Sequence, residues 1–142
     1  MEHEYLQALK EQRSGHAHDI GLEMVSIGEG MAVGKLKIED RMLNPYGAIH
    51  GGILFSIADT VGGTAALTRG YYIVTSTGNI NYLRGTEHSR MITATATEVK
   101  PGRTLSVYEV ELTDEQDRLV AKATMTYCSL GKPIDKEKIF KY

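Results

Sequence analysis

One acidic side chain is conspicuous in this sequence because it interrupts an otherwise uncharged, apolar segment. Asp59 is the only charged residue between Ile53 and Leu67. An ionisable group in such a segment is costly to bury unless it is paired or takes part in chemistry. Asp59 is therefore the first candidate for an acid–base or nucleophilic role. The alternative is a buried aspartate that caps a neighbouring strand or pairs with an arginine.

Further polar groups precede this segment. Asn44 lies in a loop, and the run His50-Gly51-Gly52 leads directly into the apolar residues. The first turn of a helix has free N–H groups and the positive end of the helix dipole. Gly51 and Gly52 would present such groups with no side chain in the way. A plain glycine turn from loop to helix is the alternative interpretation, and it would be favoured if Asp59 and Asn44 were absent.

The neighbouring polar residues also have ordinary structural explanations. Asn44 could hydrogen-bond a substrate or an attacking water, or it could form an Asx-turn before Pro45. His50 is a candidate catalytic residue, although a lone histidine more often orients a loop. Thr75 and Thr77 are two positions apart in a predicted strand, so we expect them to share one face.

Composition limits the class of protein. The 142 residues suit one ordinary domain, and the net charge of −2 gives no electrostatic footprint for nucleic acid. Cys128, the single cysteine, fits a reducing compartment. Residues 1–18 lack the apolar core of a signal peptide, and no apolar run approaches the roughly 20 residues needed to span a bilayer. We therefore expect a cytoplasmic protein without a membrane or nucleic-acid partner.

Hydrophobic periodicity predicts one long helix among several strands. Glycine and proline mark the turns between the strands, as in Pro101-Gly102. Consecutive strands with one large helix argue for an α+β antiparallel sheet, here wrapped round the apolar helix. We expect helices over His3–Arg13 and Ile53–Leu67, strands over Ile20–Ile27, Met31–Ile38, Tyr71–Leu83, Ser89–Val99, Thr104–Thr113 and Arg118–Leu130, and a lysine-rich tail over Gly131–Tyr142.

An ordered set of short motifs carries a resemblance to a known family. The motifs are Asn44, Gly47, His50-Gly51-Gly52, Ala58-Asp59, the run from Asn79 to Arg84, Gly102-Arg103-Thr104 and the run from Leu119 to Thr124. Each motif alone is weak, but the ordered set with its spacing is specific and covers Ile20 to Leu130. The sequence resembles hotdog-fold acyl-CoA thioesterases of the phenylacetate-degradation type.

The resemblance implies a fold and an activity. Residues 1–142 should form a single hotdog domain, with five to six strands round one helix and flanking segments at 1–18 and 131–142. The implied reaction hydrolyses an acyl-CoA, with an aromatic or medium-chain acyl group suggested by Tyr46 and Phe55. Asp59 would act as general base or nucleophile and the Gly51 amide as oxyanion donor. Thr75 matches the family's water-positioning hydroxyl, with Thr77 as the alternative.

Helix geometry adds an expectation about assembly. Gly51 and Asp59 are eight residues apart, about 12 Å along one helix, so one thioester cannot touch both in a single chain. If both act together, one must come from a second copy across a two-fold interface. Members of the family that this sequence resembles are homo-oligomers, often dimers of dimers.

The CoA phosphates require basic residues at the mouth of the site. Arg84, Arg103 and Lys100 are the candidates, with Gly52 and Thr77 as further substrate contacts. We expect no metal and no cofactor beyond the CoA of the substrate. Two other functions stay open: a non-catalytic hotdog module that binds acyl-CoA or acyl-carrier ligands, and a hydratase using His50 with Asp59.

Overall fold

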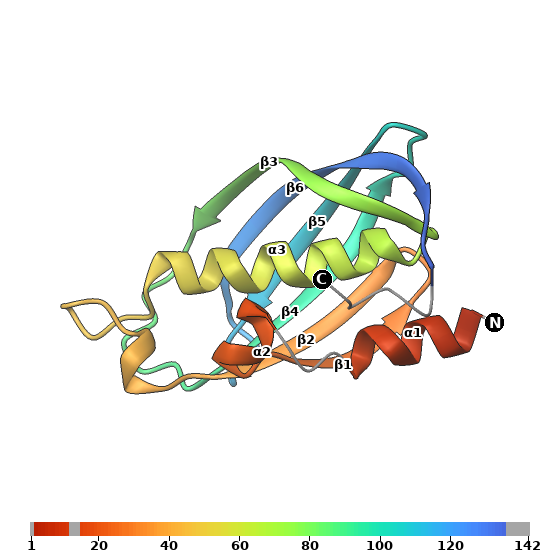
Figure 1. Ribbon diagram of the computed structural model, residues 1–142. Coiled ribbons are helices and arrows are strands. Elements are labelled where there is room, and N and C mark those ends of the chain that lie inside the picture. The colour runs from red at the N-terminus through yellow and green to blue at the C-terminus, as the bar shows by residue number, and fades with distance from the viewer. Residues whose placement is uncertain (1, 12–14, 136–142) are drawn as a thin grey trace.

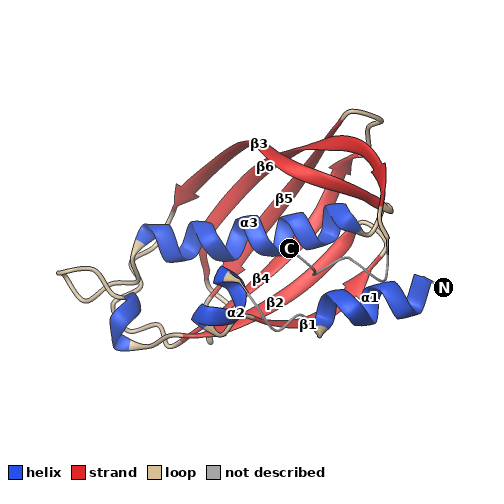
Figure 2. Cartoon of the chain, in the orientation of Figure 1, coloured by secondary structure: helices blue, strands red, loops and turns tan. Residues whose placement is uncertain are grey.

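The computed structural model describes residues 2–11 and 15–135, and its centre is a long helix held in a curved sheet (Figure 1). Six antiparallel strands form the sheet, and the helices lie on its concave side (Figure 2). The elements in chain order are α1 (Glu2–Lys10), α2 (His16–Ile20), β1 (Glu23–Gly28), β2 (Met31–Lys37), η1 (Asp40–Met42), α3 (Gly51–Leu67), β3 (Tyr71–Tyr82), β4 (Met91–Lys100), β5 (Leu105–Thr113) and β6 (Leu119–Pro133).

The strands alternate between buried and exposed residues, which gives the sheet one face toward α3. In β2, for example, Leu36 is 1% exposed while Lys35 and Lys37 face solvent. The strand order is β1-β2-β4-β5-β6-β3, so α3 is inserted in the chain between the hairpin β1-β2 and the remaining strands. This confirms the predicted α+β arrangement of a sheet around one helix.

Helix α3 fills the concavity of the sheet. Its 17 residues span roughly 25 Å. Ile57, Ala58 and Val61 have no exposed surface, and they face β2, β4 and β5. Burying one such isoleucine or valine side chain contributes roughly 1.5–3 kcal/mol to folding. Within the described residues, no helix is both long enough and apolar enough to cross a membrane.

Strand β3 forms one edge of the sheet and pairs only with β6 among the described strands. Its twelve residues carry no charge, and most of them are exposed. Thr75 pairs with Tyr127 and Thr77 pairs with Thr126, so Ser76 is an extra residue in a β-bulge. Long uncharged edges are usually covered by another strand, because their free backbone groups invite pairing.

Several predicted boundaries differ from the observed ones. The segment between the first predicted helix and the strand predicted from Ile20 contains α2, which ends at Ile20. Gly21 caps this helix in the left-handed conformation, so the strand begins at Glu23. Helix α3 begins at Gly51 rather than Ile53, and β6 continues to Pro133 because it pairs with Tyr71. Residues 12 and 13 of the first predicted helix, and 136–142 of the predicted tail, lie outside the described residues.

A buried aspartate organises the turn between β5 and β6. Asp114 Oδ1 accepts hydrogen bonds from the main-chain N–H groups of Gln116 (2.9 Å) and Arg118 (3.0 Å). Asp114 Oδ2 accepts a hydrogen bond from Arg118 Nε at 2.8 Å. Burial by itself would raise the pKa of Asp114, but these donors and the Arg118 charge outweigh burial and hold the pKa below its usual value.

We expect Asp114→Asn to lower the melting temperature at pH 7 and to do so less at acid pH. A depressed carboxyl pKa stabilises the fold above the unfolded-state value of about 3.9, and this contribution is lost as the pH falls through the lower folded-state value. Thermal unfolding between pH 7 and pH 2.5 measures the difference. Asp117→Asn in the same turn is the control, since Asp117 has a φ of 62° that asparagine tolerates. An equal difference in melting temperature between Asp114→Asn and the wild type at every pH would contradict the lowered pKa of Asp114.

Candidate active site

Asp59 lies on α3 where the helix passes β3 and β6, and both strands donate hydrogen bonds to it. Thr75 Oγ1 donates to Asp59 Oδ1 at 2.8 Å. The Tyr127 hydroxyl lies 3.3 Å from the same oxygen and 3.0 Å from the Asp59 main-chain oxygen. Thr75 and Tyr127 are cross-strand partners, so one pair of facing residues holds this carboxylate.

The electrostatic surroundings leave one carboxylate oxygen of Asp59 available. In the part of the chain that the structure describes, no lysine or arginine pairs with Asp59, and no group donates to its Oδ2. Burial, together with the charge of Asp59, raises the pKa of Tyr127 above its ordinary value, so the phenol stays protonated and donates. The carboxylate is thus anchored through Oδ1 and open at Oδ2, which suits proton transfer or attack.

The start of α3 is a second cluster of predicted residues. His50 is the N-cap, and its Nδ1 accepts the Gly52 N–H at 2.9 Å. The Gly51 N–H donates to no atom among the described residues, while the Gly51 carbonyl accepts the Tyr82 hydroxyl at 2.8 Å. Of the two glycine amides considered from the sequence, the one at Gly51 is therefore free to bind a ligand oxygen, and the one at Gly52 caps the helix.

Asn44 shapes the loop before this helix. Its side-chain oxygen accepts the N–H groups of Tyr46 (2.9 Å) and Ala48 (3.1 Å), the Asx-turn considered from the sequence. The side-chain NH₂ donates to no described residue and remains able to reach a ligand. The Asx-turn and a ligand contact are thus compatible, because they use opposite ends of one amide.

The structure separates Thr75 from Thr77. The bulge at Ser76 reverses the alternation of β3, so Thr75 faces α3 while Thr77, opposite the outward Thr126, lies on the other face. The prediction that the two threonines share a face is therefore wrong, because periodicity cannot show an extra residue in a strand. Of the two threonines, Thr75 is the one that donates a hydrogen bond to Asp59.

A cavity of about 490 Å³ opens beside the C-terminal end of α3. Arg103 lines it and has no ion-pair or hydrogen-bond partner among the described residues, whereas Arg69 is held by Glu98 and Glu29. The lining comes from α3, the start of β3, the β4–β5 turn and the end of β6: Ala66, Arg69, Tyr71, Ile73, Pro101, Gly102, Arg103, Ser106, Ser129 and Gly131.

The predicted basic residues do not all gather at this cavity. Lys100 ends β4 in the same turn as Arg103 and is exposed. Arg84 follows β3 at the opposite end of α3, where Tyr82 contacts Gly51. Within one protomer, Arg84 and Arg103 therefore lie at opposite ends of the central helix.

Gly102 has a structural explanation that needs no ligand. A Cβ atom at Gly102 would lie 1.8 Å from the Leu105 carbonyl oxygen, so only glycine fits this turn. In the family motif around residue 102, the glycine is therefore explained by folding. The guanidinium of the neighbouring Arg103 has no partner among the described residues.

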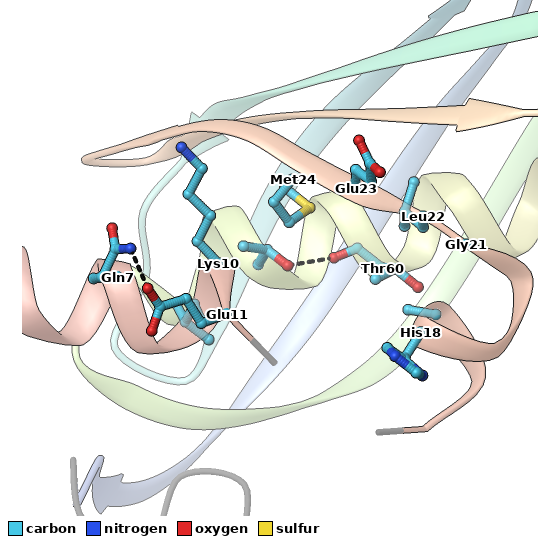
Figure 3. A pocket seen from close by; sticks show the side chains of 12 residues that line it. Gln7, Lys10, Glu11, His18, Gly21, Leu22, Glu23, Met24 and Thr60 are labelled. Atoms are coloured by element: carbon cyan, nitrogen blue, oxygen red, sulfur yellow. Dashed lines mark hydrogen bonds between the residues drawn. The ribbon is translucent and has the colours of Figure 1, made fainter. Parts of the chain in front are cut away.

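A second cavity, of about 600 Å³, lies between α1, the α2–β1 segment and α3 (Figure 3). Thr60 and Thr64 line it from α3, and Lys10 and Glu23 lie at its walls. None of the predicted site residues is among its lining. Within the described residues, no three His, Cys, Asp or Glu side chains are grouped as a metal site would require.

Sequence reasoning missed the two tyrosines of the site, Tyr82 and Tyr127. The sequence carries a signal for Tyr127, because Ala121, Ala123 and Met125 alternate toward the core and Tyr127 continues that row. No sequence signal shows that its hydroxyl reaches Asp59, since that depends on how β6 is placed against α3.

Comparisons with known proteins agree with this arrangement. The model of a family described as the thioesterase superfamily matches residues 46–121. Acyl-coenzyme A thioesterase PaaI of Escherichia coli is 35% identical over 74% of this chain and 75% of its own length. The structure of E. coli PaaI matches with a TM-score of 0.86 and 30% identity, over 94% of this chain and 99% of that one.

A solved protein of Streptococcus mutans, bound to acetyl-CoA, is also similar. It has a TM-score of 0.79 and 31% identity, over 87% of this chain and 97% of that one. These matches confirm the hotdog fold and the PaaI-type resemblance expected from the sequence motifs.

We expect His50→Ala to lower the free energy of unfolding by about 1 kcal/mol, the usual loss for an N-cap. His50→Asn should retain most of the stability, because its side-chain oxygen can accept the same N–H. Thermal or urea unfolding measures the change, with His88→Ala as control for an exposed loop histidine. Equal stability of His50→Ala and His88→Ala would argue against the cap.

Proposed function

The chain belongs to the thioesterase superfamily, and on that premise we propose that it hydrolyses an acyl-CoA to a carboxylic acid and free CoA at Asp59. The observation that carries the proposal is a half-buried carboxylate held by Thr75 at one oxygen and open at the other. Such anchoring orients a general base before the substrate arrives.

In the proposed reaction, Asp59 Oδ2 takes a proton from water as the water oxygen bonds to the thioester carbon. The carbon–sulfur bond then breaks, and the proton passes to the departing CoA sulfur. In the alternative route, the same oxygen attacks the carbon directly and expels the CoA sulfur as a thiolate, forming an anhydride. Water then cleaves the anhydride to the free acid and the Asp59 carboxylate, and the proton released goes to the thiolate. In both routes Thr75 keeps Oδ1 in place.

The developing negative charge on the thioester oxygen needs a donor, and the hydroxyls that Thr75 and Tyr127 place beside Asp59 already donate to the carboxylate. We assign this role to the free Gly51 N–H of a second copy. The uncharged edge strand β3 is the surface on which a copy would pair, about a two-fold axis. Thr75 contacts Asp59 and Tyr82 contacts Gly51, so the two groups lie beside different points of β3. The two-fold axis reverses β3 of one copy relative to β3 of the other, so such pairing brings the start of one α3 toward Asp59 of the other. A dimer is the minimum assembly, and a dimer of dimers is expected.

The same two-fold arrangement accounts for the separated arginines. Arg84 lies near the Gly51 end of α3, and Arg103 lies near the other end of α3 beside the cavity. Across an antiparallel interface these two ends meet, so Arg103 of one copy and Arg84 of the other can bind the phosphates of one CoA. Lys100 would add a second positive charge for the phosphates beside Arg103. The Asn44 NH₂ group would bind the thioester or the water.

We expect Asp59→Asn to reduce thiol release by roughly 10²–10⁴-fold, the range for a lost general base. Gly51→Pro should reduce it by roughly 10²–10³-fold by removing one N–H. Proline suits the backbone of this first helical position, and His50 has a compatible ψ of 132°. Gly51→Ala keeps the N–H and controls for the added Cβ, which would lie 3.0 Å from the Tyr82 hydroxyl oxygen. Phenylacetyl-CoA, benzoyl-CoA and medium-chain acyl-CoAs are the substrates, with released thiol titrated. Asp117→Asn is the matched carboxylate control.

Mixing these two inactive variants tests whether the site is shared. A heterodimer of Asp59→Asn and Gly51→Pro subunits, isolated with two tags, contains one intact site and should recover roughly half the wild-type turnover. An inactive heterodimer would place both groups within one protomer. Tight acyl-CoA binding by the wild type without thiol release would instead support the non-catalytic module.

We expect Arg103→Ala to raise KM for acyl-CoA about tenfold while kcat stays near the wild-type value, because a phosphate contact contributes to binding rather than to the reaction. With an acyl-pantetheine substrate, which lacks the nucleotide, the same variant should match the wild type. Arg90→Ala is the control, because Arg90 is exposed and its guanidinium donates to the Ser89 main-chain oxygen rather than to a side chain of the described residues. A lower kcat for both substrates would show that Arg103 acts elsewhere.

A further inference from the structure

Two tyrosines of the sheet donate to α3 at the same two residues that the proposed reaction uses. The Tyr82 hydroxyl of β3 donates to the Gly51 main-chain oxygen at 2.8 Å. The Tyr127 hydroxyl of β6 lies 3.0 Å from the Asp59 main-chain oxygen. A helical carbonyl has two lone pairs, so each phenol adds a contact to the helix without displacing a helical hydrogen bond.

The contact at Tyr127 depends on a glycine one helical turn beyond Asp59. A Cβ atom at Gly62 would lie 2.5 Å from the Tyr127 hydroxyl and 3.3 Å from Val110. Tyr127 is 1% exposed and packs edge-on against Tyr108, with ring centroids 5.9 Å apart, so it cannot move aside easily. Gly62 thus gives the phenol its access to Asp59.

We propose that Tyr82 and Tyr127 are positioning residues that fix the placement of Gly51 and Asp59 along the sheet. The inference rests on the proposed function, because it concerns the alignment of two groups that act on one thioester. The apolar contacts of α3 are non-directional and tolerate small shifts along its axis. A phenol hydrogen bond is directional, and the two together define the axial position of the helix.

This positioning matters most at a site shared by two copies. The strand β3 would carry both the interface and Tyr82, so the distance from one Gly51 to the other copy's Asp59 depends on how each helix is placed against its own strands. A misplacement of about 1 Å in reacting groups can reduce a rate by roughly a hundredfold.

The first test compares Tyr127→Phe and Tyr82→Phe with Tyr108→Phe in the acyl-CoA thiol-release assay. We expect each of the first two to lower kcat roughly tenfold with KM within about twofold, the effect of one lost hydrogen bond on alignment. Tyr108 donates to Glu98 rather than to α3, so Tyr108→Phe should retain kcat even if it melts earlier. Wild-type kcat in both Tyr127→Phe and Tyr82→Phe would overturn the proposal.

The second test is a thermal double-mutant cycle that needs no activity. Gly62→Ala should lower the melting temperature in the wild type, although alanine normally favours a helix. In the Tyr127→Phe background the clashing oxygen is gone, so the same change should cost clearly less. An equal loss in both backgrounds would overturn the contact. Absence of thiol release from the wild type would instead count against the proposed function, and the cycle would still decide on the contact.

Discussion

The structure depends on placing a nearly uncharged helix inside a curved sheet. Such a helix is stabilised by burial on most of its surface, so the polar atoms that it buries against the sheet need hydrogen-bond partners. The strands supply partners to Asp59 Oδ1 and to the main-chain oxygens of Asp59 and Gly51. The partners are hydroxyl groups, from Thr75 and Tyr127 at Asp59 and from Tyr82 at Gly51. Hydroxyls hold one oxygen of the carboxylate without adding an opposing charge, and no described lysine or arginine pairs with Asp59.

Most of the fold could be predicted from the sequence because strand and helix periodicities are strong here. The alternation of β2 and β5 and the apolar run of α3 gave the elements and their order. One boundary that failed depends on a distant partner. Strand β6 continues past Leu130 only because Tyr71 pairs with Pro133, and no local pattern shows this.

The candidate site was less accessible to sequence reasoning. Asp59 and Gly51 could be selected because one charge and two glycines are unusual in such a segment. The choice between Thr75 and Thr77 required the register of β3 against β6. Tyr127 requires the placement of α3 over the sheet. In both cases the elements were predicted correctly, but the way in which they pack against one another could not be predicted from the sequence.

The bulge in β3 also bears on how relatives of this chain should be aligned. Ser76 has no partner on β6, so the strand could lose one residue there without losing its ladder on either side. Because Thr75 would keep Tyr127 as its partner and Thr77 would keep Thr126, loss of Ser76 would leave Thr75 facing the carboxylate. A relative without the bulge would therefore have one residue fewer between the group beside Asp59 and the downstream motif. An alignment anchored only on the downstream Asn79–Arg84 motif would then equate residues that occupy opposite faces.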